Sequence, residues 1–100
     1  MKITNNQVHE FLNRLHGEEG CNFRKDKKGE DTWTCKAAGP NYGEHNLARK
    51  ILTKMGISKT EQKRFIDECK EYGGYCDCEI LFNSAETLVK KYKFIKKIKR

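Results

Sequence analysis

The sequence predicts a small α+β domain in which a β-hairpin packs with about four helices. Apolar residues recur at helical spacing in four stretches, and a polar turn with a glycine separates two short segments of alternating side chains. Five cysteines in a chain of 100 residues also favour a bound metal. Because 36% of the residues are hydrophobic and 35% are charged, the core is small, and a structural metal commonly stabilises such domains.

A first helix is expected to begin after Thr4. Thr4 is a typical N-cap residue, and Gln7 three positions later completes a capping box. Glycines at positions 17 and 20 end the helix. Its apolar face is formed by residues at helical spacing, namely Val8, Phe11, Leu12 and Leu15.

A β-hairpin is expected next, with strands at 20–25 and 31–36 around a polar turn. Alternation places Cys21 and Phe23 on one face of the first strand and Trp33 and Cys35 on one face of the second. We expect these faces to pack inward, with Trp33 in the core and Cys21 as a small buried side chain.

Two central helices follow a loop at 37–44. His45 opens the first of them, and Ser58 caps the second, with Glu61 completing a capping box. The second helix ends at a glycine pair, Gly73 and Gly74, because glycine readily adopts a left-handed C-cap. The expected inward faces comprise Leu47, Ala48, Ile51, Leu52, Met55, Phe65, Ile66, Cys69 and Tyr72, with Cys69 as a core thiol.

The last part of the chain begins with an apolar run, 79–82, which forms either a third strand or the lead into a helix. Ser84 is expected to cap that helix from Ala85 onward. We therefore divide the chain into a compact domain, 1–84, and a basic C-terminal helix or tail, 85–100. The apolar side of this helix comprises Leu88, Val89, Tyr92, Ile95 and Ile98.

Cys76 and Cys78 carry the metal prediction. Two thiols one residue apart do not readily form a disulfide with each other, but both can turn toward one Zn²⁺ ion. Cys35 ends a predicted strand and His45 starts a predicted helix, so both can reach inward. The predicted zinc ligands are therefore Cys35, His45, Cys76 and Cys78, and the ion would close the loop between hairpin and helix.

Net charge separates the tail from the rest of the chain. Residues 85–100 carry a net charge of +6, whereas the other residues carry +1. Basic side chains neutralise phosphates and aromatic rings stack on bases, so we expect the tail to contact nucleic acid or an acidic protein surface. The predicted contact residues are Lys90, Lys91, Lys93, Lys96, Lys97, Lys99 and Arg100, with Tyr92 and Phe94 among them.

Two other functions are compatible with these features. The first is an interaction or inhibitor protein that docks on a partner enzyme. The second, less favoured, is a zinc hydrolase with Glu44 or Glu79 as base, because thiolate-rich four-ligand sites are normally closed. No apolar run is long enough for a membrane span, and the N-terminus has no signal-peptide pattern, so we expect a cytoplasmic protein.

Residues 72–83, Tyr-Gly-Gly-Tyr-Cys-Asp-Cys-Glu-Ile-Leu-Phe-Asn, resemble the closing signature of small bacterial proteins known as domain of unknown function 2695. The helix opened by His45 is also similar to that family, and the resemblance covers roughly residues 33–83. It implies a cysteine–histidine site and no particular reaction. Many members place the cysteine closer to the histidine than Cys35 is to His45, so Cys21 and Cys69 are alternatives to Cys35.

Overall fold

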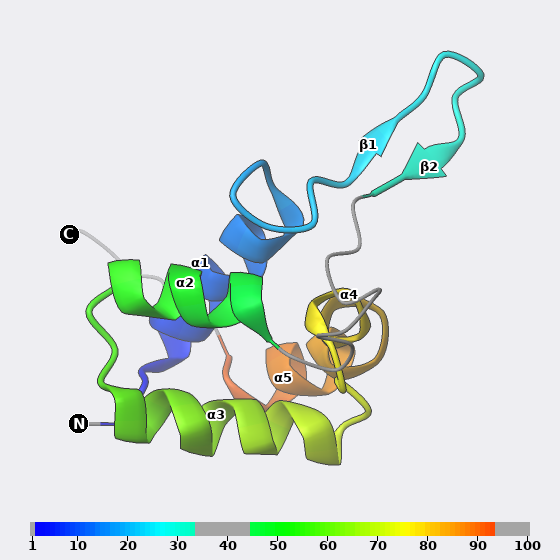
Figure 1. Ribbon diagram of the computed structural model, residues 1–100. Helices are drawn as coiled ribbons and strands as arrows, with labels where there is room; N and C mark the ends of the chain where they lie inside the picture. The colour runs from blue at the N-terminus through cyan, green and yellow to red at the C-terminus, as the bar shows by residue number, and fades with distance from the viewer. Residues whose placement is uncertain (1, 34–44, 94–100) are drawn as a thin grey trace, which may run out of the picture.

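The computed structural model describes residues 2–33 and 45–93 and places the helices around one apolar core (Figure 1). In the described part, four helical segments and a two-stranded antiparallel hairpin agree with the predicted α+β class. The chain order is α1 (Asn5–His16), β1 (Arg24–Lys25), β2 (Asp31–Thr32), α2 (Asn46–Lys54), α3 (Lys59–Glu71), and the continuous segment α4 (Asp77–Glu79), η1 (Ile80–Ser84) and α5 (Ala85–Lys91).

Helix α1 begins as predicted. The Thr4 hydroxyl accepts a hydrogen bond from the Gln7 amide, and the Gln7 side chain accepts one from the Thr4 amide. This capping box satisfies two amides that lack partners within the helix. The predicted apolar face of α1 is buried.

Helices α2 and α3 also follow the predicted boundaries, with one difference at the start of α3. The Ser58 hydroxyl accepts from the Glu61 amide, which confirms Ser58 as the N-cap. The Glu61 carboxylate does not complete a capping box. It accepts instead from the Ile3 amide at 2.8 Å and from the Arg64 guanidinium, and so ties the N-terminus to α3. Gly73 ends α3 with a positive φ of 91°, as predicted.

The hairpin is present, but it is short and projects away from the helices (Figure 1). Arg24 pairs with Thr32 and Lys25 with Asp31. The prediction that Trp33 lies in the core is wrong, because the side chain is 40% exposed. Alternation along a strand defines a shared face, but Phe82 covers this face only in part, so Trp33 stays exposed to solvent.

The apolar run at 79–82 is helical, so the alternative of a third strand is wrong. Residues 77–91 form one continuous helical segment with a π-helical turn, η1, in its middle. Ser84 therefore does not cap a new helix. Its hydroxyl donates to the Cys69 carbonyl at 2.8 Å, which joins this segment to α3. Val89 was predicted on the apolar side but is exposed.

The end of α5 is anchored to α3 through buried Glu68. The Tyr92 hydroxyl donates to this carboxylate at 2.6 Å, and the Lys91 ammonium and the Arg64 guanidinium pair with it. Leu88 and Tyr92 belong to the same core cluster as the faces of α1 and α3. The first turns after residue 84 therefore pack on the body of the protein. No described helix is long and apolar enough to cross a membrane.

Candidate functional site

Two buried cysteines that are far apart in sequence meet at one point of the fold. The Sγ atoms of Cys21 and Cys78 lie 3.6 Å apart, close enough for a weak thiol hydrogen bond. Cys21 follows the turn after α1, where its amide bonds to the Leu15 carbonyl, and Cys78 lies in α4. The pair therefore connects the N-terminal helix to the segment that carries the Cys76-Asp77-Cys78 motif.

Cys76 is also buried, and it lies two residues before Cys78 in the sequence, at the N-cap of α4. Burial raises the pKa of its thiol, the Glu79 carboxylate raises it further, and the side chain makes no capping hydrogen bond to α4. A metal ion bound to this sulfur would offset the cost of burying its negative charge. A thiolate at Cys76 therefore requires a bound cation.

Cys69 is a different kind of cysteine. It is buried in the core face of α3, as predicted for a core thiol, and burial raises its pKa to about 12. This pKa describes the thiol without a metal, so position in the fold, and not the pKa, decides between the candidate ligands. Of the two alternatives to Cys35, the geometry favours Cys21, because it lies beside Cys78. Cys35 itself lies outside the described residues.

His45 reaches the same motif from the start of α2. It is buried, and its Nε2 donates to the Gly74 carbonyl at 2.9 Å, two residues before Cys76. With Nε2 protonated, Nδ1 carries the lone pair, which is the arrangement of metal-binding histidines held by a backbone carbonyl. A Cβ at Gly74 would lie 3.0 Å from the Cys69 carbonyl and would collide with the Ser84 side chain. The close packing of Gly74 against the end of α3 and against η1 therefore requires glycine.

Asp77, between the two cysteines, has a structural role that the sequence analysis missed. Its buried carboxylate accepts from the Leu47 amide at 3.1 Å and the Ala48 amide at 3.0 Å, at the N-terminus of α2. His45 makes no side-chain capping bond there. The N-cap residue of α2 is not a Ser, Thr, Asp or Asn. The sequence therefore indicates that another residue must accept the hydrogen bonds of the first amides of α2. Burial raises the pKa of Asp77, although these two amides favour its charged form.

The structure brings some of the predicted ligands to one region without forming a complete site. Cys78, Cys76 and His45 all lie at the junction of α2, α4 and the α3 C-terminus, and Cys21 joins them through Cys78. Among residues 2–33 and 45–93, however, no three His, Cys, Asp or Glu side chains are gathered closely enough to hold a metal ion. The arrangement supplies a thiol pair, and an imidazole that is bound to the backbone two residues before Cys76.

The predicted tail contacts lie partly on this body. Lys90 and Lys93 are exposed, whereas Lys91 pairs with buried Glu68. Tyr92 is buried, so its ring cannot serve as a stacking platform, and the interpretation of Tyr92 as a base contact is wrong. The remaining predicted contacts, Lys96, Lys97, Lys99 and Arg100, lie outside the described residues, as does Phe94.

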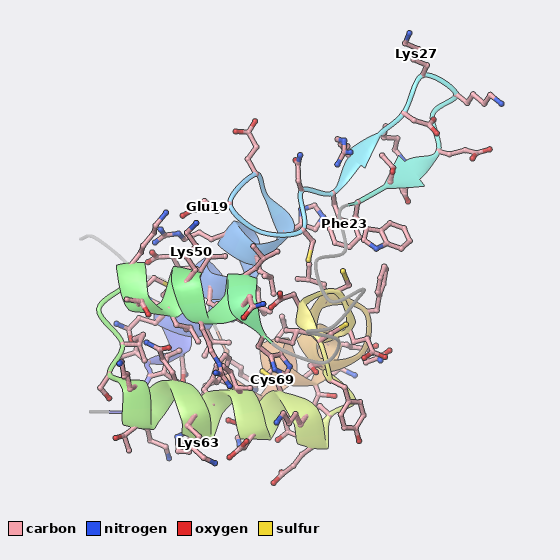
Figure 2. All side chains as sticks on the ribbon, in the orientation of Figure 1. Glu19, Phe23, Lys27, Lys50, Lys63 and Cys69 are labelled. Atoms are coloured by element: carbon pink, nitrogen blue, oxygen red, sulfur yellow. The ribbon has the colours of Figure 1, made fainter. Side chains whose placement is uncertain are left out.

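An aromatic cluster forms where the base of the hairpin meets α1 and η1, and no pattern in the sequence predicted it. The rings of His16, Phe23 and Trp33 are stacked in a row, with centroids 4.9 Å and then 5.4 Å apart. Phe82 packs edge-on against Phe23 and Trp33, and it is 54% exposed. Figure 2 shows Phe23 at the base of the hairpin, where it joins the helical body. We call these four residues the aromatic cluster.

The fold and the cysteine region define a small α+β domain with buried thiols at the meeting point of its helices. Residues 41–83 match the family described as "Protein of unknown function (DUF2695)". The predicted resemblance is confirmed for this segment, which contains His45, Cys76 and Cys78, whereas Cys21 and Cys35 precede it. No curated protein and no solved structure matches the chain.

Proposed function

We propose that the protein is a small zinc-stabilised binding module whose basic C-terminal segment contacts an anionic partner. The observation that carries the zinc proposal is the pair of buried thiols, Cys21 and Cys78, with Sγ atoms 3.6 Å apart. In a tetrahedral site with Zn–S bonds of about 2.3 Å, two sulfurs are about 3.8 Å apart. The pair therefore has nearly the separation of one edge of a zinc–thiolate tetrahedron.

The other two ligands would come from Cys76, His45 and Cys35. The Nε2 bond of His45 to the Gly74 carbonyl leaves Nδ1 as the ring nitrogen that can bind a metal, and Cys76 is buried two residues before Cys78. Bound zinc would link the segment after α1 to α4, across 57 positions of sequence. Such links contribute folding free energy directly, on the order of 10 kcal/mol in small zinc peptides.

Zinc content of single variants tests the metal proposal. The protein is purified from zinc-supplemented medium, and zinc is measured by mass spectrometry together with the melting temperature. We expect one zinc ion per chain, lost with Cys78→Ser and Cys21→Ser and retained with Cys69→Ser, the matched control. Cys35→Ser and His45→Gln then show which of the two completes the site. Equal zinc loss in all the cysteine variants, or none in any, would contradict the proposal that Cys21 and Cys78 bind zinc.

The partner proposal depends on the charge of the last residues. Residues 85–100 carry a net charge of +6, and α5 holds their start against α3 through Glu68 and Tyr92. We expect a triple change of Lys96, Lys97 and Lys99 to glutamine to weaken oligonucleotide binding and its salt dependence. The same change at Lys25, Lys27 and Lys28 of the hairpin is the control.

The aromatic cluster favours a second candidate, a protein-interaction module. Trp33 and Phe82 are large exposed side chains in contact with each other, and aromatic residues are enriched at the centres of protein interfaces. A partner retained in stoichiometric amount by the wild type and released by Trp33→Ala with Phe82→Ala would support this function. Tyr75→Ala is the control, since Tyr75 is also exposed. Retention of the same partner by the double variant would exclude the cluster as the interface.

A further inference from the structure

A groove of about 470 Å³ lies between α2 and α3, on the helices rather than on the tail. This volume falls within the range of ligand-binding pockets, roughly 300–1,000 Å³. Four of its lining residues are basic and one is acidic. The buried side chain of Ile66 supplies apolar surface at the groove, so the groove combines a strongly cationic lining with an apolar element.

The basic residues of α3 form a row along the groove. Lys59, Lys63 and Lys70 lie on one helix face, because at 100° per residue their directions differ by at most about 40°. With a rise of 1.5 Å per residue, the row is about 16 Å long. Phosphates of one stacked nucleic-acid strand follow each other every 3.4 Å or so along the axis, so the row could face several linked phosphates. A single phosphate could reach only one end of it.

The charges in the groove are only partly neutralised. Asp67 pairs with Lys63 at 2.8 Å and lies 4.0 Å from Lys70, and these two cations, together with the charge of Arg49, hold the pKa of Asp67 below its ordinary value. Arg49, on α2, and Lys59 form no salt bridge with any described residue. The groove therefore presents four cations, from two different helices, around a single carboxylate, and Arg49 and Lys59 make no salt bridge with a described residue.

We propose that this groove binds a flexible chain of linked phosphates, as presented by single-stranded nucleic acid or by inorganic polyphosphate. Arg49 and Lys59 are the primary contacts, because neither makes a salt bridge with a described residue and the planar guanidinium of Arg49 suits two phosphate oxygens. Asp67 opposes binding by occupying Lys63 and Lys70. The proposal shares an anionic partner with the proposed function, but it rests on separate residues and requires neither the tail nor zinc.

The test compares two double variants of the full chain that lose the same charge. A fluorescein-labelled oligo(dT) is titrated by anisotropy at several salt concentrations. Arg49→Gln with Lys59→Gln should weaken binding several-fold and reduce the slope of log K against log salt by about 1.4, or 0.7 per phosphate contact. Lys50→Gln with Lys54→Gln removes two exposed cations of α2 that do not line the groove, and should change both quantities less (Figure 2 labels Lys50 and Lys63).

Asp67→Asn gives a result that misfolding cannot imitate, because it should tighten binding by releasing Lys63 and Lys70. Equal weakening by the two double variants, or no tightening with Asp67→Asn, would overturn the proposal. A loss of binding seen only in the tail variants would support the proposed function and would contradict the proposal that the groove is the binding site. These outcomes therefore separate the two ideas.

Competitors identify the ligand chemistry. Unlabelled oligo(dT) and inorganic polyphosphate should displace the probe, and their relative strength distinguishes the two sources of linked phosphates. Orthophosphate at the same total phosphate concentration should displace little. Displacement by orthophosphate as effective as by polyphosphate would show a site for one compact anion, and equal displacement by poly-glutamate would show a site for acidic proteins. Either result would contradict the proposal.

Discussion

Replacement of Asp77 by alanine is the change that most directly tests how the Cys76-Asp77-Cys78 motif is built. The carboxylate accepts hydrogen bonds from the Leu47 and Ala48 amides, and it is 1% exposed. Without it, two amides at the start of α2 lose their acceptor in a region that water hardly reaches. Unsatisfied buried donors cost about 1–3 kcal/mol each, and loss of a helix cap costs about 0.5–2 kcal/mol.

We therefore expect Asp77→Ala to lower the free energy of unfolding by about 3 kcal/mol, after allowing for relief of the buried charge. For a domain of this size, 1 kcal/mol corresponds to roughly 4–8 °C, so the melting temperature should fall by about 12 °C or more. Asp77→Asn keeps one acceptor oxygen and should lose less. Asp31→Ala, which removes an exposed ion pair with Lys25, should change little.

The assay is urea unfolding followed by far-ultraviolet circular dichroism, at one fixed zinc concentration for all variants. Asp77→Ala and Asp31→Ala carry the same change of charge, so any common effect of net charge cancels between them. A midpoint for Asp77→Ala equal to that of Asp31→Ala would refute the conclusion that this carboxylate caps α2.

Three further outcomes are expected. Although burial disfavours the charge of Glu68, its bonds to Lys91 and Tyr92 hold its pKa below the ordinary 4.5, and a hydrogen bond from Arg64 lowers that of Glu61. The ionised carboxylates therefore stabilise the fold at pH values above their unfolded-state pKa, and this stabilisation is lost as the pH falls through their folded-state pKa. When the urea midpoint is plotted against pH, we expect it to fall less steeply in acid for Glu68→Gln than for the wild type. Phe65→Ala should cost about 3–5 kcal/mol in urea unfolding because the ring is fully buried, whereas Trp33→Ala should cost clearly less. Cys69→Ala should lower the melting temperature slightly and leave zinc content unchanged.

Local signals explain why most helix boundaries could be predicted from the sequence. Thr4 with Gln7, Ser58, and Gly73 act within a few residues of themselves, so their positions alone specify caps and ends. Helical periodicity likewise identified the buried faces of α1 and α3, because a regular helix fixes which residues share a side. These inferences need no knowledge of the tertiary fold.

Features that depend on distant parts of the chain could not be predicted in the same way. Asp77 accepts from the Leu47 amide 30 positions earlier, and Glu61 binds the amide of Ile3, so neither partner is visible from local spacing. Trp33 was misplaced because an alternating pattern cannot tell whether another layer covers its apolar face. Ser84 resembles a cap in sequence, but the helix continues through it and its hydroxyl bonds to α3 instead.

The candidate metal site shows the same division. Spacing alone identified Cys76 and Cys78 as a pair and placed His45 at a helix start. It could not show that Cys21, rather than Cys69, lies beside Cys78, because that contact bridges 57 positions. The choice between Cys21 and Cys69 depends on tertiary packing, which five cysteines in a sequence leave open.

Zinc stoichiometry of the purified wild-type chain, measured beside Cys21→Ser and Cys69→Ser, addresses the central proposal most directly. One zinc ion per chain in the wild type and in Cys69→Ser, with none in Cys21→Ser, is the predicted result. A wild-type protein that is folded and free of zinc after growth in zinc-supplemented medium would contradict it.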